Sequence, residues 1–237
     1  MSGVRKGERW GAPSTAPADT TTTGDDRALA RVVADALAGG PGSGSQGSGA
    51  ARVRIAWRAA PDADFARAVS ATRASDETPY DLPCDALRVT ASHGAPGVAV
   101  NMAVLGTAPD RARWWDRSAR VRVSVDGRVV HDGRATGVVV ANGEFLRGAA
   151  VIVRGHPGDG RLEVQVYAVP RGQRGALRRR VRTASHVPHP GIVQASGRRV
   201  EIEVAGHGWA LESDGLAGPR TREVVVEILP EAFVLVT

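Results

Sequence analysis

The sequence predicts an α+β fold that is mostly β, with an antiparallel β-sandwich in its C-terminal part. Between residues 84 and 237, short apolar or alternating segments follow one another, and turn-forming residues separate them. Helical spacing of apolar residues is confined to the N-terminal part and to one arginine-rich segment. Many short strands with regular turns are typical of a sandwich or a split barrel.

The N-terminal part divides by composition. Residues 1–22 are rich in Gly, Pro, Ser, Thr and Ala, which predicts a disordered leader. Residues 23–83 predict an α/β segment, where Asp25 and Asp26 cap a helix that Gly39-Gly40 ends. The other expected elements of this segment are a Gly/Ser loop over 39–50, a short strand over Val53–Trp57 and a helix over Asp62–Ala71.

Residues 84–237 predict the sandwich domain. Asp126-Gly127 lies between alternating valines, a strong indication of a hairpin. The stretch Thr136–Val169 contains turn residues at Asn142-Gly143 and Pro157–Gly160, and it predicts three strands at the centre of a sheet. The other expected strands are Ala86–Thr90, Val98–Val104, Arg120–Val125, Arg128–His131, Arg198–Val204, Arg222–Leu229 and Ala232–Val236. The polar segment Arg171–Arg182 predicts a short helix or a long loop.

Alternation is clearest at the end of the stretch Thr136–Val169. One set of side chains points one way and the other set points the opposite way: Leu162, Val164, Val166 and Ala168 against Glu163, Gln165 and Tyr167. This period of two predicts a strand with one buried face.

Composition limits the function classes. Cys84 is the only cysteine, which excludes an intramolecular disulfide and a multi-cysteine zinc site. No apolar run approaches the roughly 20 residues of a membrane span, and the first residues have no apolar core typical of a signal peptide. We therefore expect a cytoplasmic protein without a transmembrane segment, either free or peripheral at the inner membrane face.

The chain carries a net charge of +6, which favours anionic partners. Lys6 is the only lysine, however, and the richness in Arg, Ala, Gly and Val is also typical of a GC-rich genome. Both explanations remain open, and no pattern indicates an oligomeric state.

Five sequence features occur in a characteristic order over residues 23–237. They are Gly24-Asp25 opening a helix, Asp64-Phe65-Ala66-Arg67, a VVVAN…DGxLxV block from Val138 to Val164, a His-x-x-His-Pro block at His186–Pro190, and Asp214-Gly215. In this order the sequence resembles the bacterial diacylglycerol kinase and related lipid kinase family. The resemblance implies a nucleotide-binding α/β domain and a β-sandwich, with ATP and a lipid meeting between them.

The resemblance implies that the family's Gly-Gly-Asp-Gly-Thr phosphate loop corresponds to Thr23–Arg27. Gly24, Asp25, Asp26 and Arg27 are then the nucleotide-binding positions, although Asp26 replaces a flexible glycine and its carboxylate would repel a phosphate. Arg27 could compensate as a phosphate-binding cation. The alternative is a plain capped helix start. The family's Gly-Thr-Gly-Asn-Asp-Phe-Ala-Arg motif corresponds to Ala60–Arg67, with its helical half intact and its turn lost.

The family begins with a strand–helix–strand–helix region before the phosphate loop, whereas only residues 1–22 precede it here. We therefore expect a shortened, degenerate relative, or a start site that lies further upstream. The resemblance also implies a structural Mg²⁺ held by the Asp159 carboxylate and the backbone carbonyls of His156 and Arg161, as its preference for oxygen ligands suits. The alternative is a simple hairpin turn.

The family's Asp-Gly-Glu motif carries the proposed proton acceptor, and here it reads Asp214-Gly215-Leu216. Leucine cannot accept a proton, so Glu212 or Asp214 would have to substitute as the base. We therefore expect a pseudokinase with weak or no phosphorylation of a lipid hydroxyl, using ATP and Mg²⁺ if active and no cofactor otherwise. The alternative is a non-catalytic module that binds lipid, membrane or protein.

Arginines and exposed aromatic residues provide the remaining candidates. The arginine cluster over 171–182 could contact an anionic membrane or be a solvated loop. Trp114-Trp115 could anchor at a lipid interface or form a core or subunit contact. His186 and His189 are expected as turn and packing residues. Nucleic-acid binding lacks a recognition motif and ranks last.

Overall fold

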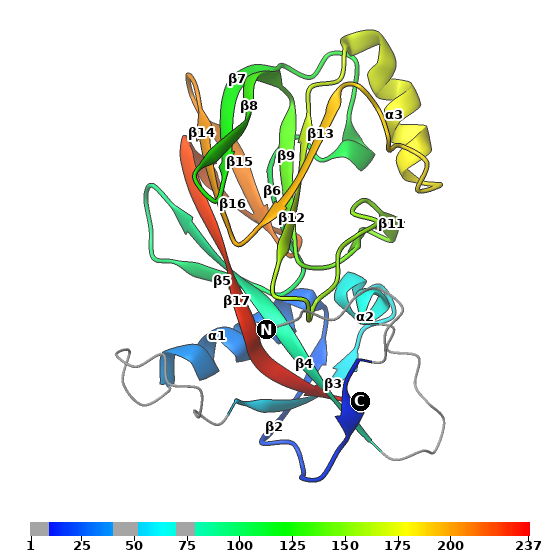
Figure 1. Cartoon of the computed structure of the whole chain (residues 1–237), viewed down its shortest axis with the longest axis vertical. Coiled ribbons are helices and arrows are strands. Elements are labelled where there is room, and N and C mark those ends of the chain that lie inside the picture. Colours follow the sequence, from blue (N-terminus) through cyan, green and yellow to red (C-terminus); the bar gives the residue numbers. More distant parts are fainter. Residues whose placement is uncertain (1–9, 40–51, 70–78) are drawn as a thin grey trace.

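The computed structural model describes residues 10–39, 52–69 and 79–237. Two long antiparallel strands run through both halves of the molecule: β4 (Tyr80–Ala91) and β17 (Glu223–Val236) (Figure 1). They pair from Val224 with Ala91 to Val236 with Asp81, with a shift of register between Leu229 and Phe233. The predicted domain boundary at residues 83–84 therefore falls within a continuous strand.

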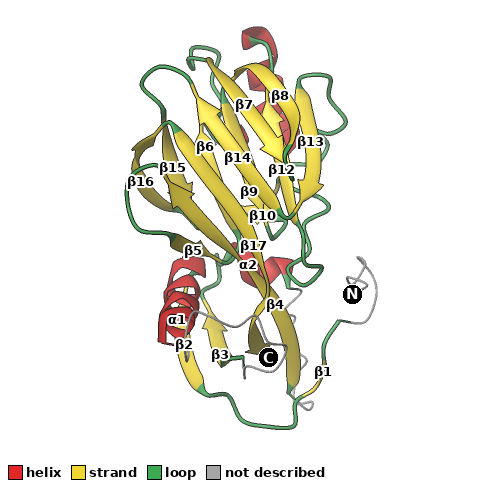
Figure 2. Cartoon of the chain, turned by 60° about the vertical axis from the view of Figure 1, so that its left-hand side comes forward, coloured by secondary structure: helices red, strands yellow, loops and turns green. Residues whose placement is uncertain are grey.

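The upper half of the molecule is a sandwich of two sheets, as Figure 2 shows. The first sheet has the order β1-β4-β17-β14-β7-β8 and the second β13-β12-β9-β6-β15-β16. Apolar side chains from both sheets form the core between them. The strands not yet located are β1 (Ala12–Pro13), β6 (Met102–Gly106), β7 (Ala119–Val125), β8 (Arg128–Ala135), β9 (Gly137–Ala141), β12 (Leu162–Tyr167), β13 (Ile192–Gly197), β14 (Arg199–Val204), β15 (Trp209–Ser213) and β16 (Leu216–Thr221).

The lower half extends the first sheet with parallel strands. Strand β3 (Arg54–Ala59) pairs in parallel with the end of β17, and β2 (Thr20–Gly24) pairs in parallel with β3. Helices α1 (Asp26–Gly39) and α2 (Asp64–Ala68) pack here through a second apolar cluster that includes Phe65 and Phe233. The short strand β5 (Gly97–Ala99) pairs with β4 beside α1.

Strand β12 is buried on both faces of the six-stranded sheet, so the prediction of one buried face for residues 162–168 is wrong. Tyr167 and Gln165 are 1% and 3% exposed. Helix α3 (Arg174–Val181) and the hairpin of β10 (Phe145–Leu146) and β11 (Ala149–Ala150) contribute to a third apolar cluster that covers this outer face. Two 3-10 helices, η1 (Pro109–Arg111) and η2 (Arg171–Gln173), flank the same region.

The predicted mostly β, α+β fold is confirmed, with several local corrections. Residues 20–22 belong to β2 and not to a disordered leader, of which residues 1–9 lie outside the described residues. The expected strands 222–229 and 232–236 are one strand, and 98–104 is interrupted at Val100-Asn101. Strands β13, β15 and β16 were not predicted. Of the predicted loop at 39–50, Gly39 belongs to α1 and residues 40–50 lie outside the described ranges. Residues 70 and 71, at the end of the second predicted helix, lie outside them too.

Candidate functional site

Two adjoining cavities lie where the sandwich meets α1 and α2. The larger has a volume of about 670 Å³ and the smaller about 470 Å³. Asp25, Arg27 and Asp214 line both cavities, so helix α1 and the β15–β16 turn form the boundary between them. The structure thus brings together the two ends of the predicted site, the start of α1 and the Asp-Gly turn, which are far apart in the sequence.

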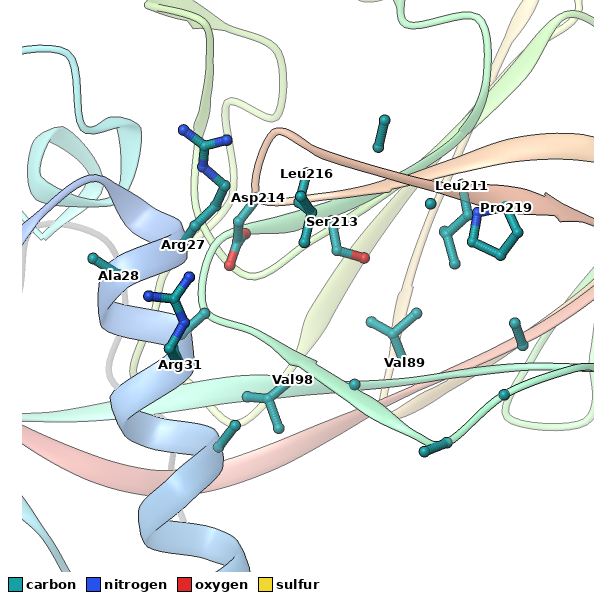
Figure 3. A pocket seen from close by; sticks show the side chains of 18 of the residues that line it. Arg27, Ala28, Arg31, Val89, Val98, Leu211, Ser213, Asp214, Leu216 and Pro219 are labelled. Carbon is teal, nitrogen blue, oxygen red and sulfur yellow. The ribbon is translucent and has the colours of Figure 1, made fainter.

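The larger cavity is mainly apolar and has arginines at one end. Figure 3 shows Arg27 and Arg31 on α1 and Asp214 opposite, with Val89, Val98 and the leucines further along. Apolar side chains line most of it: Ala28, Ala30, Ala34, Val89, Ala91, Val98, Leu211, Leu216 and Pro219. A cavity of this volume and composition suits a ligand with a hydrocarbon part and a polar head.

The start of α1 is closed by its own side chain. Asp25 Oδ1 accepts a hydrogen bond from the backbone N–H of Ala28 at 3.1 Å, as a helix-capping residue does. Asp25 Oδ2 pairs with the Arg27 guanidinium, and this bond lowers the pKa of Asp25. The helix N-terminus and the cation that could hold a phosphate therefore already have a carboxylate partner.

Asp26 is buried and hydrogen-bonded within the protein at the edge of the smaller cavity. It is 6% exposed, and its oxygens accept hydrogen bonds from the Phe65 N–H and from Asn101 Nδ2, each at 3.1 Å. Burial raises the pKa of Asp26 to about 6, with a contribution from the nearby Asp64 charge. Asp26 thus joins α1 to α2 and to the β5–β6 connection.

Asp64 holds the turn between β10 and β11 in place. Its carboxylate accepts the backbone N–H groups of Arg147 and Gly148, the latter at 2.7 Å. Both residues have positive φ angles, +50° and +77°, so the turn has a backbone conformation that most residues avoid. The aspartate of the Ala60–Arg67 segment therefore positions a turn that borders the smaller cavity.

Arg147 forms ion pairs with two carboxylates of the site. Its Nε and Nη2 donate to both oxygens of Asp110 at 2.8 and 2.9 Å, and its Nη1 donates to Glu212 at 2.5 Å. Arg111 lies 3.9 Å from the other oxygen of Glu212. Glu212, a predicted substitute base, is thus held by an arginine that the sequence analysis did not select.

Asp214 is anchored by three backbone donors. Its oxygens accept the N–H groups of Val100, Asn101 and Met102 at 2.7, 3.0 and 2.9 Å. Burial, followed by the charge of Asp26, raises the pKa of Asp214 to about 7. Leu216, the position at which the resemblance implies the family glutamate, is 60% exposed and lines the larger cavity.

The predicted magnesium turn lies away from both cavities. Asp159 Oδ1 accepts the Arg161 N–H at 2.9 Å, and the Asp159 N–H approaches the His156 carbonyl at 3.4 Å. Burial raises the pKa of Asp159, so the turn offers a partly desolvated carboxylate beside backbone carbonyls, which are ligands that suit Mg²⁺. In the described part of the chain, no three acidic, histidine or cysteine side chains gather into a metal-binding group.

Asp85 is a buried acid that the sequence analysis missed. It is fully buried, and its oxygens accept the N–H groups of Gly160 and Glu231, both at 2.7 Å. Burial raises its pKa to about 6. The two histidines have local contacts: His186 Nε2 lies 2.9 Å from the Val151 carbonyl, and His189 Nδ1 accepts the Gly191 N–H.

The sequence did hold one indication of the two buried polar residues that the sequence analysis missed. Each is a polar residue inside an apolar run. Asn101 interrupts the run from Val98 to Val104, and Asp85 interrupts that from Leu82 to Val89. Both are buried. Since buried polar groups are normally hydrogen-bonded, such interruptions point to a structural or functional contact.

The comparisons with known proteins agree with this architecture. A family model described as the YegS C-terminal NAD kinase beta sandwich-like domain matches residues 104–237. No match was found among curated proteins. Among the described residues, none of the helices is long and apolar enough to span a bilayer.

Solved structures of Bacillus anthracis str. Sterne proteins assigned as diacylglycerol kinases share the fold. Two of them have TM-scores of 0.68 and 0.69 at 15% and 16% identity, and each alignment covers 92% of this chain and 77% of the other. A third has a TM-score of 0.63 at 15% identity, covering 92% and 75%. The family match spans more than half of the sequence, and the predicted resemblance is confirmed: the chain belongs to the family of diacylglycerol kinase-like proteins with the YegS C-terminal NAD kinase beta sandwich-like domain.

Proposed function

We propose that this chain is a lipid kinase homologue that binds a lipid in its larger cavity and phosphorylates the lipid hydroxyl weakly or not at all. The observation that carries the proposal is Leu216. It lines the apolar cavity at the position where the resemblance implies the proton-accepting glutamate. A base must lie within hydrogen-bond reach of the proton that it takes, and leucine cannot accept one.

The two acidic neighbours are poorly suited to replace that glutamate. Arg147 holds the Glu212 carboxylate in an ion pair. Three backbone N–H groups fix the Asp214 carboxylate in place. The pKa of Asp214 is raised to about 7, and Asp214 lines the larger cavity, so we assign any residual proton transfer to Asp214.

The smaller cavity suits a nucleotide triphosphate poorly. Six carboxylates line it, those of Asp25, Asp26, Asp62, Asp64, Glu212 and Asp214, against four arginines, Arg27, Arg67, Arg111 and Arg147. The excess of negative charge disfavours a phosphate chain. The Asp25 carboxylate also occupies the capping position of α1. If Mg²⁺ binds, Asp159 with the carbonyls of His156 and Arg161 would hold it as a structural ion. We therefore derive no catalytic step through ATP.

Transfer of the γ-phosphate from Mg-ATP to diacylglycerol in detergent micelles tests the proposal. The natural chain is expected to transfer at or near background, and Leu216→Glu to transfer faster, since it places a carboxylate at the family position. The exposed side chain makes this change nearly neutral for stability, within about 0.5 kcal/mol. Rapid transfer by the natural chain, reduced by Leu216→Glu, would overturn the proposal.

A non-catalytic module that binds a protein or a membrane is the second candidate. It is favoured by the exposed Trp114 and Trp115 on the surface next to α3. A chain that binds no lipid in the larger cavity but binds a surface through these residues would support that candidate instead.

A further inference from the structure

We propose that one surface of the sandwich docks on an anionic membrane, with two tryptophans entering the headgroup region and arginines contacting lipid phosphates. This tryptophan–arginine surface consists of Arg111, Arg113, Trp114, Trp115, Arg178 and Arg182. None of these residues lines the larger cavity, so this proposal can be confirmed or refuted independently of the proposed function.

The tryptophan pair is the most exposed aromatic group of the described residues. Trp114 and Trp115 are 65% and 54% exposed, whereas Trp209 is buried and the other two tryptophans are partly buried. The two rings contact each other edge to face, with their centroids 5.4 Å apart. An indole combines an apolar ring with one N–H donor, and such side chains concentrate at the boundary between water and lipid.

Arginines surround the pair. The Arg113 guanidinium lies 5.3 Å from the Trp115 ring centroid. Arg111, Arg113, Arg178 and Arg182 line a hollow of about 420 Å³ together with Trp115. In the described part of the chain, no carboxylate lies within ion-pair distance of Arg113, Arg178 or Arg182.

The two acids in this hollow already have partners. Asp110 accepts both hydrogen bonds of the Arg147 fork, and Asp116 Oδ2 accepts the backbone N–H of Arg113 at 2.7 Å. The charges of Arg113, Arg178 and Arg182 are thus available to anionic groups. A guanidinium binds phosphate oxygens with a planar pair of donors.

A buried arginine fixes the two parts of the surface relative to each other. Arg174, at the start of α3, is 4% exposed and donates to the carbonyls of Val169 and Asp116 at 3.1 and 2.6 Å. Leu177 and Val181 pack on the sheet below. The next turns of α3 therefore present their arginines at a set distance from the tryptophan loop, so little conformational freedom is lost on docking.

The surface adjoins the candidate site. Arg111 lines both the hollow and the smaller cavity, and Asp110 in the hollow pairs with Arg147 of that cavity. In Figure 1, α3 and β11 lie on the same side of the molecule. A bilayer docked here would hold lipid headgroups next to the smaller cavity.

Charge and ring geometry favour a membrane over the other anionic or apolar partners. A second copy of the chain would present the same positive surface and be repelled. Single-stranded nucleic acid stacks on open aromatic faces, whereas these two rings are perpendicular, at 88°, and Arg113 covers one of them.

Vesicle co-sedimentation of the full chain tests the proposal, with phosphatidylcholine vesicles that contain or lack phosphatidylglycerol. We expect binding only to the anionic vesicles, weakened by salt, with a blue shift of tryptophan fluorescence. Arg178→Gln with Arg182→Gln should weaken binding about 25-fold, since each surface cation contributes about a fivefold effect. Trp114→Ala with Trp115→Ala should weaken binding and abolish the blue shift.

The matched control is Arg128→Gln with Arg198→Gln. It removes the same charge from exposed positions near the β7–β8 turn, at the other end of β7 from the tryptophans, and it should leave binding within about twofold of the natural chain. Equal losses in control and test variants would overturn the proposal, because they would indicate a general charge effect. Binding of single-stranded DNA in preference to vesicles, or a dimer that Trp114→Ala with Trp115→Ala dissociates, would overturn it too.

Discussion

Arg147 Nη1 donates a hydrogen bond to Glu212 Oε1 at 2.5 Å, which ties the turn between β10 and β11 to strand β15. The same guanidinium holds Asp110 through two further bonds. One guanidinium therefore pairs with two carboxylates beside the smaller cavity.

Replacing Arg147 should destabilise the fold. Arg147→Ala leaves Asp110 and Glu212 without their common partner, and their side chains are only 15% and 21% exposed. We expect a loss of about 1–3 kcal/mol in the free energy of unfolding, the cost of leaving buried charged groups unpaired. Urea unfolding measures it, with the exposed Arg128→Ala as control. Equal stability of the two variants would contradict the role given to Arg147.

Stability should fall as pH rises through the weakly acidic range. The pKa values of Asp26 and Asp214 are raised by burial from 3.8 to about 6 and about 7, so the folded state binds more protons than the unfolded state between pH 3.8 and 7. The free energy of unfolding then decreases with increasing pH there, by an amount on the order of a few kcal/mol. The lowered pKa of Asp25 acts in the opposite direction, through a group that is largely solvated.

Asp214→Asn checks the origin of this pH dependence. The amide does not titrate, so the decrease between pH 5 and 7 should become smaller than in the natural chain, as denaturant unfolding at several pH values would measure. A natural chain whose stability rises steadily up to pH 7 would be inconsistent with buried acids of raised pKa.

Nucleotide binding should be too weak to raise the unfolding temperature at millimolar Mg-ATP, and Asp26→Gly should not strengthen it. The substitution removes the acceptor for the Phe65 N–H and for Asn101 Nδ2, so we expect a destabilisation of about 1–3 kcal/mol. Thermal unfolding with and without millimolar Mg-ATP measures both effects. Saturating ligand would stabilise the fold by about 2.7 kcal/mol at 100 times its dissociation constant, so a clear upward shift of the natural chain would refute the account of the α1 start.

The sandwich could be predicted from the sequence because alternating valines and Asp-Gly turns report directly on strands and hairpins. The two long paired strands β4 and β17 could not be predicted in full. Residues 222–229 and 232–236 are separated by Pro230-Glu231, and only the pairing with β4 makes them one strand. Strand β2 is composed of threonines and a glycine, and its pairing with β3 stabilises it rather than its own composition.

The candidate site was predicted in part. Asp25, Asp26 and Asp214 were selected from motifs, and the structure brings Asp25 and Asp214 to the same two cavities. The partners of these residues could not be predicted, because Asn101 and Arg147 act across sequence separations of 75 and 65 residues. Such long-range contacts depend on how the halves of the chain pack, and no local pattern encodes them.

The most direct test of the central claim measures lipid binding and phosphate transfer in one sample. Calorimetric titration with a short-chain diacylglycerol, followed by an assay for phosphorylated lipid after Mg-ATP is added, would do this. We predict that the natural chain binds the lipid without transfer above background. Ala34→Trp, which fills the larger cavity, should abolish binding. Leu37→Trp, at an exposed position of α1 that does not line the cavity, should not. Transfer at a rate unchanged by Leu216→Glu, or binding unaffected by Ala34→Trp, would contradict the account.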